Sequence, residues 1–588
     1  MSTPPLSNAE IAERFELLAD LLELDGAEIY RTLAYRRAAK TLRETPESVV
    51  RMSEQGRLTD LPNVGRTIAD KVAELRETGT LQALEKLKAR TPPGVVPLMR
   101  IPGIGPKTAR KIFADLEITT LQEAVVAAEQ GRIRGLAGMG EKTEQAILAG
   151  AMVAEGEKRP RVSSAKLRPF AERVVGMLRR VDGVERCEIA GSLRRYTDTA
   201  KDIDLVVSAT DPEAVAEAFV TGDWVAAVES KGTTKSAAVA YDGTRVELRI
   251  VAPGVFGNLL QHLSGSKDHN VAIREQAVRA GLKVSEYGIE VVETGELFET
   301  DDEVEVYRRL GMEWVPPELR ENRGEIEAAR NGDLPDLIEP SQIRGDLHSH
   351  TDWSDGKTTL EAMVAAARDR GYGYLNITDH SPAVGFGMGL DAGRLRRQID
   401  RVRELAGTCA PGFVLLAGCE VDILRDGSLD YSDELLAELD VVVASVHASH
   451  RLSEPDQTKR ICAALENPHV DILGHPTGRL ISRREGYAVD MEAVIDKAVE
   501  TGTVLEVSAQ PDRLDLRDTH VRLAVKAGAR LAIDTDAHSV AALDYSRFGV
   551  MNARRGWATP ADVVNTREWP QVRELLKDGR AGVAGRRS

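Results

Sequence analysis

Two aspartates stand two residues apart in the run Asp-Ile-Asp-Leu-Val-Val at positions 202–207. The run alternates polar and apolar residues at its start, which predicts a half-buried β-strand. Because residues i and i+2 of a strand share a face, the carboxylates of Asp202 and Asp204 would project together. Two carboxylates held that close repel each other unless a cation lies between them. Mg²⁺ suits such a site, since it takes few protein carboxylates and completes its shell with water and substrate phosphates.

A glycine, a serine and two arginines precede these aspartates, within residues 191–195. Backbone N–H groups, a hydroxyl and fixed positive charge can together hold a triphosphate. The aspartate pair alone is a weak signal, because most such pairs belong to a solvated strand face. The full order of Gly-Ser, basic residues and Asp-x-Asp on a strand is more specific. It resembles the nucleotidyltransferase core of the DNA polymerase beta family, family X.

The resemblance to family X covers nearly all of residues 160–320 and implies a role for each matched position. The family's third carboxylate falls at Glu247, which with Asp202 and Asp204 would bind two Mg²⁺ or Mn²⁺ ions about 4 Å apart. These ions would activate the primer 3′-hydroxyl and stabilise the leaving pyrophosphate. The matched nucleotide-binding positions are Arg161, Ser192 and Arg195 for the triphosphate, Asn270 for the incoming base and Arg274 for the template minor groove.

Four positions depart from the family pattern. Glu247 stands where the family has aspartate, His262 and Leu263 replace the aromatic pair under the nucleotide sugar, and Lys201 replaces a glycine. One extra methylene moves a carboxylate by about an ångström, and an error of ~1 Å can cost on the order of 100-fold in rate. We therefore expect the fold to survive and polymerisation to be weak, improved by Mn²⁺ and less selective for the sugar.

A second group of chemically active residues recurs at the ends of short apolar runs after residue 345. Its six histidines and three carboxylates are His348, His350, Asp355, His380, Glu420, His447, His475, Asp536 and His538. The apolar runs alternate with helical stretches, which predicts an α/β barrel. Because the carboxyl ends of barrel strands form one rim, these side chains would converge.

The nine residues look like the complete ligand signature of the polymerase-and-histidinol-phosphatase (PHP) domain, a distorted TIM-like barrel. By that resemblance one ion is bound by His348, His350, Glu420 and Asp536, a second by Glu420, His447 and His475, and a third by Asp355, His380 and His538. Mixed nitrogen and oxygen ligands suit Zn²⁺ or Mn²⁺. A metal-bound hydroxide attacking phosphorus would hydrolyse a phosphoester. Arg479 could orient the phosphate; a surface salt bridge is the equal alternative.

Three short runs near the N-terminus each combine an apolar residue, a tight turn and the start of a helix. They occupy residues 61–71, 101–109 and 136–143, and their glycines are Gly65, Gly103, Gly105, Gly138 and Gly140. Glycine lets the backbone turn sharply toward a phosphate while the amides of the new helix face it. One copy alone could be an ordinary turn between helices. Three copies favour helix-hairpin-helix motifs that grip DNA without reading its bases, with a weaker grip in the first, where Asn63 replaces glycine.

Lys71 lies six residues beyond Gly65. In the polymerase beta family the matching lysine belongs to a small domain that removes 5′-deoxyribose phosphate through a Schiff base. Such an imine requires a lysine whose pKa is lowered by burial or nearby cations. A solvated lysine or a simple phosphate contact is the alternative.

Composition bounds the remaining possibilities. The chain of 588 residues has a net charge of −16, which argues against whole-surface attraction to nucleic acid but leaves local patches possible. Its four cysteines form no CxxC pair, which favours a reducing cytoplasm. No apolar run approaches the roughly 20 residues of a membrane span, and the first residues lack a signal pattern. We expect a cytoplasmic monomer with no membrane contact.

These features predict a multidomain α/β protein. We expect a helical DNA-binding and lyase-like domain at 1–80, a helix-hairpin-helix domain at 81–155, a polymerase beta-like α+β palm and thumb at 156–325, a linker at 326–344 and a PHP barrel at 345–588.

This order resembles the bacterial and archaeal members of family X. It implies short-gap synthesis in base excision repair, a 3′→5′ exonuclease, and cleavage at abasic sites as a further possibility. The partners would be dNTPs and gapped or nicked duplex DNA with its 3′ ends. The intact PHP ligands beside an altered polymerase site give weight to an alternative, a nuclease whose polymerase half serves as a DNA clamp. A non-catalytic module that binds DNA ends is the other alternative, for which nothing in the ligand set argues.

Overall fold

The computed structural model describes residues 6, 8–45, 48–101, 104–136, 138–154, 161–384 and 388–577. The chain divides into two compact units, Met1–Pro160 and Arg161–Ser588. Among the described residues, no helix is long and apolar enough to cross a membrane.

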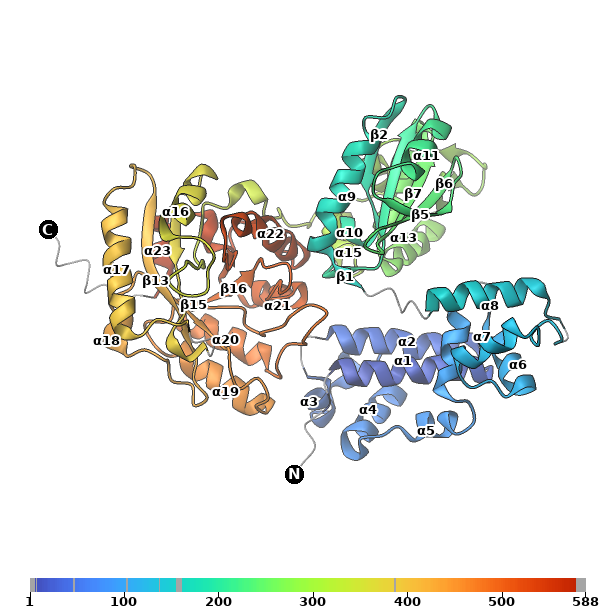
Figure 1. Cartoon of the computed structure of the whole chain (residues 1–588), viewed down its shortest axis with the longest axis horizontal. Helices are drawn as coiled ribbons and strands as arrows, with labels where there is room; N and C mark the ends of the chain where they lie inside the picture. The colour runs from blue at the N-terminus through green and yellow to red at the C-terminus, as the bar shows by residue number, and fades with distance from the viewer. Residues whose placement is uncertain are drawn as a thin grey trace. The chain divides into compact units, whose positions relative to one another are not determined.

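The first unit is helical (Figure 1). Its α-helices are α1 (Asn8–Asp25), α2 (Ile29–Glu44), α3 (Val49–Glu54), α4 (Arg66–Thr78), α5 (Gln82–Lys88), α6 (Pro106–Leu116), α7 (Leu121–Glu129) and α8 (Glu141–Ala154). Leu18 of α1, Leu75 of α4, Ile112 of α6 and Ile147 of α8 belong to one buried cluster. The boundary predicted at residue 80 therefore lies within a continuous apolar core.

The second unit begins with the part that we call the palm (residues 161–251). Its five-stranded sheet has the order β2-β4-β7-β6-β5. The strands are β2 (Val184–Ile189), β4 (Ile203–Ala209), β5 (Val225–Ser230), β6 (Lys235–Ala240) and β7 (Arg245–Val251), with α9 (Ser164–Leu178) and α11 (Pro212–Val220) contributing to the same core. β4 and β7 are parallel, and Asp204 lies opposite Glu247 in their register.

The thumb (residues 256–331) follows. It contains α12 (Phe256–Ser264), α13 (Lys267–Arg279), β8 (Leu282–Ser285), β9 (Gly288–Val291), β10 (Leu297–Phe298), α14 (Glu303–Arg309) and α15 (Glu325–Asn331). We predicted a linker at 326–344, but the structure has packed chain there, because Ile326, Leu337 and Ile338 are all buried. Trp557 from the C-terminal region belongs to the thumb's apolar cluster, so the thumb and that region share a core.

Seven parallel strands form the C-terminal barrel (residues 345–577; Figure 1), in the order in which they occur in the chain. They are β11 (Gly345–Asp346), β12 (Tyr374–Ile377), β13 (Val414–Asp422), β14 (Val441–Ser445), β15 (Ile472–Leu473), β16 (Val504–Ser508) and β17 (Leu531–Asp534). A parallel bridge between Ser349 and Ala537 brings the chain after the first strand to the chain after the last. The sheet is therefore nearly closed, and the prediction of a distorted TIM-like barrel is confirmed.

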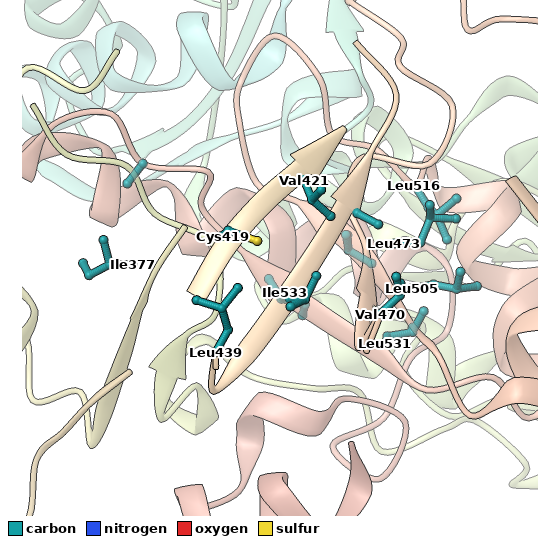
Figure 2. Packing of buried hydrophobic residues seen from close by; sticks show 14 of the residues in the cluster. Ile377, Cys419, Val421, Leu439, Val470, Leu473, Leu505, Leu516, Leu531 and Ile533 are labelled. Carbon is teal, nitrogen blue, oxygen red and sulfur yellow. The ribbon is translucent and has the colours of Figure 1, made fainter. Parts of the chain in front are cut away.

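Helices cover the outer face of the barrel sheet. The helices are α16 (Leu360–Asp369), α17 (Ala392–Ala406), α18 (Asp433–Leu436), α19 (Glu454–Leu465), α20 (Met491–Thr501), α21 (Asp518–Ala527) and α22 (Ser546–Arg555). A last helix, α23 (Trp569–Leu575), contributes Val572 to the apolar cluster of the other sheet face. Figure 2 shows part of the core, in which Val421, Leu473, Leu505 and Ile533 from four strands lie together. Apolar residues of α16, α17, α20 and α21 belong to the same cluster.

Candidate metal centres

Alternation along the barrel strands separates apolar side chains from the candidate ligands. On β16, Leu505 and Val507 belong to the helix-facing core, and Glu506 lies between them. On β13, Cys419 and Val421 pack outward in the same way, which directs Glu420 to the opposite face. Because successive side chains of a strand point to opposite faces, the carboxylates between these apolar residues face the barrel interior.

Glu420 lies at the centre of the candidate site. Its Oε1 atom is 2.9 Å from Nε2 of His475 and 3.3 Å from Nε2 of His447. Its Oε2 atom is 2.9 Å from Nδ1 of His380, 3.3 Å from Nε2 of His348 and 3.5 Å from Nε2 of His350. The two oxygens of one carboxylate thus face separate sets of imidazoles, so Glu420 could be shared between two ions.

Two further carboxylates complete the cluster. Asp536 Oδ1 is 3.1 Å from Nε2 of His350, and Asp355 Oδ2 is 3.1 Å from Nε2 of His538. Asp355 Oδ1 also lies 3.6 Å from Nε2 of His380. All nine sequence-predicted ligands are therefore brought together.

The grouping of these atoms differs in detail from the expected partition. Three sets have all their ligand atoms within 4.8 Å of one another: His350 with Asp355, His380 and His538; His348 with His350 and Asp536; and His380 with Glu420 and His447. His350 and His380 therefore each belong to two of the sets.

Burial and charge indicate that cations fit this cluster. His348 and His350 are fully buried, and the Nε2 atoms of both lack a hydrogen-bond partner among the described residues, as does Oε2 of Glu420. Burial and the neighbouring His538 and His380 lower the pKa of His350 to about 3, which favours the neutral imidazole that metals require. Burial opposes ionisation of Glu420, but the imidazoles around it hold its pKa well below the usual range. Divalent metal ions are bound by neutral imidazole nitrogens and ionised carboxylate oxygens whose lone pairs are not used in hydrogen bonds, and this cluster offers both.

Sequence reasoning missed the residues that support these ligands. Nδ1 of His348 lies 2.6 Å from Oε1 of Glu506, whose Oε2 accepts the backbone N–H of His475 at 2.5 Å. Nδ1 of His447 lies 3.3 Å from Oδ1 of Asp422. Such partners fix the tautomer and orientation of a ligating histidine. Glu506 is the only charged residue within the short run 504–508, and this position was the sequence signal that could have identified it.

The expectation that Arg479 orients a phosphate must be corrected. Its guanidinium is buried and donates to both carboxylate oxygens of Asp198, at 2.7 and 3.1 Å, and to the carbonyl of Leu514. Arg513 lies at the metal cluster instead, with Nε 3.7 Å from Oδ2 of Asp536. Burial and the charge of Arg513 lower the pKa of His475 to about 4.

The carboxylates of the palm form a second candidate metal site. Burial and the charges of Asp202 and Glu247 raise the pKa of Asp204 to about 6. This excess of negative charge fits a cation. Gly191 begins the short helix α10 (Gly191–Arg194) with φ of +63°, and a Cβ atom there would lie 2.1 Å from Oδ2 of Asp204. The glycine of the motif therefore makes room for the carboxylate.

Glu247 is paired with two basic side chains. Its Oε1 atom lies 2.7 Å from Nζ of Lys235, and its Oε2 atom accepts from Nη1 of Arg245 at 3.0 Å. Arg245 Nη1 also lies 3.7 Å from Oδ2 of Asp202. Burial opposes ionisation of Glu247, but these cations lower its pKa. Of the three carboxylates, Glu247 thus has the shortest ion pairs with basic side chains.

Three of the predicted nucleotide-binding residues, Arg161, Ser192 and Arg195, lie near this palm site. Arg161 Nε donates to Oγ1 of Thr199 at 2.8 Å, and its pKa is lowered by burial and by Arg195 while Asp202 opposes the shift. Ser192 lies in α10. The charge of Arg195 acts on Asp204, although its Nε atom donates to Glu321 at 3.0 Å.

His262, one of the departures from the family pattern, lies beside the two remaining predicted contacts. Its backbone carbonyl accepts a hydrogen bond from Nδ2 of Asn270 at 2.7 Å, and its Nδ1 atom is 3.4 Å from Nη2 of Arg274.

Four turn residues of the hairpins in the first unit show two kinds of backbone geometry. Gly65 and Gly105 are the N-cap residues of α4 and α6. Asn63 and Gly138 have φ values of +63° and +82°, the left-handed region that glycine and asparagine tolerate best. Gly103 lies outside the described residues. Lys71 is half-buried on α4.

Comparison with known proteins supports this organisation. Four family models match the chain: a helix-hairpin-helix domain at residues 6–81, a SAM-like helix-hairpin-helix tandem at 95–152, the DNA polymerase beta thumb at 259–321 and the PHP domain at 346–508. A probable phosphatase of Thermoanaerobacter sp. (strain X514) is 28% identical over 253 residues, which cover 41% of this chain and 97% of that protein.

One relative matches nearly the whole chain. The DNA polymerase/3′-5′ exonuclease PolX of Bacillus subtilis (strain 168) is 38% identical over 571 residues, covering 97% of this chain and 99% of that protein. Both candidate metal centres fall within this match. The chain therefore belongs to the family X DNA polymerases that carry a C-terminal PHP domain.

Proposed function

We propose that this protein fills short gaps in DNA during base excision repair with its palm, and removes nucleotides from 3′ ends with its barrel. The observation that carries the proposal is the presence of two separate metal-fitting carboxylate sites, one around Asp204 and one around Glu420, in a single compact unit. The similarity to a polymerase and 3′-5′ exonuclease over nearly the full length supports assigning one activity to each.

In the barrel, the nine ligands would hold up to three Zn²⁺ or Mn²⁺ ions. Bound ions of this kind supply Lewis acidity and activate water at neutral pH. Glu506 and Asp422 contact the Nδ1 atoms of His348 and His447 and would keep these imidazoles oriented for ligation. Arg513 contributes a guanidinium beside Asp536 that can orient the phosphodiester. Arg513→Ala should lower exonuclease kcat/KM by about 10- to 100-fold; unchanged hydrolysis would remove this role.

In the palm, Asp202, Asp204 and Glu247 would hold Mg²⁺ or Mn²⁺ for nucleotide transfer. Arg161, Ser192 and Arg195 would hold the triphosphate, while Asn270 and Arg274 would contact the incoming base and the template. The ion pairs from Lys235 and Arg245 to Glu247 compete with metal binding by that carboxylate. This competition favours slow synthesis and keeps open the second candidate function, a PHP nuclease whose palm mainly clamps DNA.

The test uses a one-nucleotide-gapped duplex with dNTPs, in Mg²⁺ and separately in Mn²⁺. Glu420→Ala should abolish the exonuclease and leave the palm intact. Extension by this variant that disappears on adding Asp202→Ala would support the repair polymerase. Absence of extension in either metal, while the unmutated protein still degrades 3′ ends, would support the clamp instead.

The first unit would hold the DNA backbone through its hairpins without reading sequence. Lys71 is a candidate for removal of 5′-deoxyribose phosphate, supported by its half-buried place on α4. If borohydride fails to trap Lys71 on incised abasic DNA, this activity is excluded. We also propose a cytoplasmic monomer; Cys187, Cys409, Cys419 and Cys462 form no disulfide with one another, as is usual in a reducing compartment.

A further inference from the structure

A series of charged side chains, buried at Asp518 and Arg555 and more exposed at Arg323, connects the palm and thumb to the barrel. Its members are Arg195, Glu321, Arg323, Asp518 and Arg555. Arg195 belongs to the palm, Glu321 and Arg323 to the thumb, and Asp518 and Arg555 to the barrel. The side chains of Arg555 and Asp518 are each 6% exposed, so water screens their charges little.

Arg555, the last residue of α22, contacts position 195 in two ways. Its Nη1 atom donates to the backbone carbonyl of Arg195 at 2.8 Å and to Oε1 of Glu321 at 3.1 Å. The same Glu321 oxygen accepts Nε of Arg195 at 3.0 Å. Nη2 of Arg555 is held by Oδ2 of Asp518 at 2.9 Å. One carboxylate oxygen thus joins a guanidinium of the palm to a guanidinium of the barrel.

A second contact helps to fix the orientation of the Arg195 guanidinium while Glu321 holds it. Its Nη1 atom donates to the carbonyl of Ser264 at 3.2 Å, and its charge acts on both Asp204 and Arg161. A long side chain loses rotamer entropy when it binds a ligand, so contacts that hold it beforehand raise affinity. Glu321 supplies such a contact to Arg195, and Arg555 fixes Glu321.

We propose that Arg555 of the PHP barrel is a positioning residue for nucleotide binding in the palm, acting through Glu321 and Arg195. The proposal rests on the proposed role of Arg195 in holding the triphosphate. It gives the barrel a function in polymerisation that is independent of its own metal ions. Removing Arg555 leaves Glu321 without one of the three guanidinium groups whose charges act on it, and leaves the Arg195 carbonyl without its buried donor.

The test is equilibrium binding of Mg²⁺·dATP to the full-length Glu420→Ala protein, measured by titration calorimetry without DNA. Arg555→Ala should raise Kd about tenfold, the effect of a lost charge-assisted hydrogen bond. Arg555→Lys keeps the charge with fewer donors and should restore part of the affinity. Lys166→Ala, which removes a half-exposed salt bridge to Asp512 across the same boundary, should leave Kd unchanged.

A double-mutant cycle separates positioning from general loosening. In an Arg195→Ala background, adding Arg555→Ala should have no further effect on Kd. The proposal would be overturned if Arg555→Ala raised Kd by the same factor in the Arg195→Ala background. It would also be overturned if Arg195→Ala alone raised Kd and Arg555→Ala alone did not. In both cases the role of Arg195 would stand. An unchanged Kd for Arg195→Ala would instead remove the triphosphate role on which the proposal depends. If Arg555→Ala does not fold, the same comparisons are made with Arg555→Lys.

Discussion

At the scale of single residues, one buried carboxylate organises two ligands of the barrel centre. Glu506 binds Nδ1 of His348 with one oxygen and the backbone N–H of His475 with the other. The first contact directs Nε2 of His348 toward Glu420, and the second holds the loop that carries His475. Glu506 therefore acts on the metal site without being a ligand.

Glu506→Gln tests this support. An amide of the same shape alters both contacts, and loss of such a partner typically weakens metal affinity by about 10- to 100-fold. We expect that much more Mn²⁺ to be needed for half-maximal exonuclease activity, with gap filling unaffected. Glu339→Gln, which alters an exposed carboxylate paired with Arg554, is the matched control. An unchanged Mn²⁺ requirement would contradict the role of Glu506.

Glu247→Asp tests the departure in the palm. A shorter carboxylate recedes from Lys235 and Arg245 and takes the length that family X uses, so we expect faster gap filling. The gain should be on the order of 10- to 100-fold, the scale of a 1 Å correction. Single-nucleotide insertion in the Glu420→Ala background measures it. A slower variant would indicate that the palm has adapted to glutamate, and Lys235→Ala would then show whether the lysine is part of that adaptation.

At the scale of elements, strand periodicity explains what could be predicted. Except for Asp355, each candidate barrel ligand stands at or just beyond the end of an apolar run. The sequence pattern was therefore enough to predict the barrel and the convergence of these side chains. The partner of Arg479 could not be predicted, because Asp198 lies 281 residues away and meets it only in the folded unit. The packing of residues 326–344 also could not be predicted, because it depends on residues distant in the sequence: Leu337 is buried in a cluster that includes Trp557.

The positive φ angle of Gly138 leads to a testable prediction about the hairpins. Gly138→Ala places a Cβ on a residue with φ of +82°, which should cost roughly 1–2 kcal/mol. Gly140→Ala is the control, because its φ is not positive and nothing lies within 4 Å of the added Cβ. We expect Gly138→Ala to lower the Tm of the first unit and to weaken duplex binding at every sequence tested, while Gly140→Ala leaves the Tm unchanged. Equal effects of the two substitutions would argue against a left-handed turn requirement.

At the scale of the whole second unit, the palm, thumb and barrel are joined by buried charge pairs. Arg479 pairs with Asp198, Arg555 with Asp518 and Glu321, and Trp557 packs into the thumb. Pairs of this kind stabilise only while every member is charged, because a buried charge without its partner costs several kcal/mol. The union of the two catalytic parts should therefore depend on pH.

Glu321 determines the direction of that dependence. Burial opposes its ionisation, but Arg555, Arg195 and Arg323 lower its pKa to about 2, below the usual value of about 4.3. Since the folded-state pKa is the lower one, this stabilisation is fully present above the unfolded-state pKa and is lost as pH falls toward 2. Lowering the pKa of Glu321 from about 4.3 to about 2 corresponds to roughly 3 kcal/mol of stability. Urea unfolding between pH 6 and pH 3 should show Glu321→Gln losing less stability on acidification than the unmutated chain. Parallel curves for the two proteins would mean that Glu321 is not held as a buried anion between the palm and the barrel.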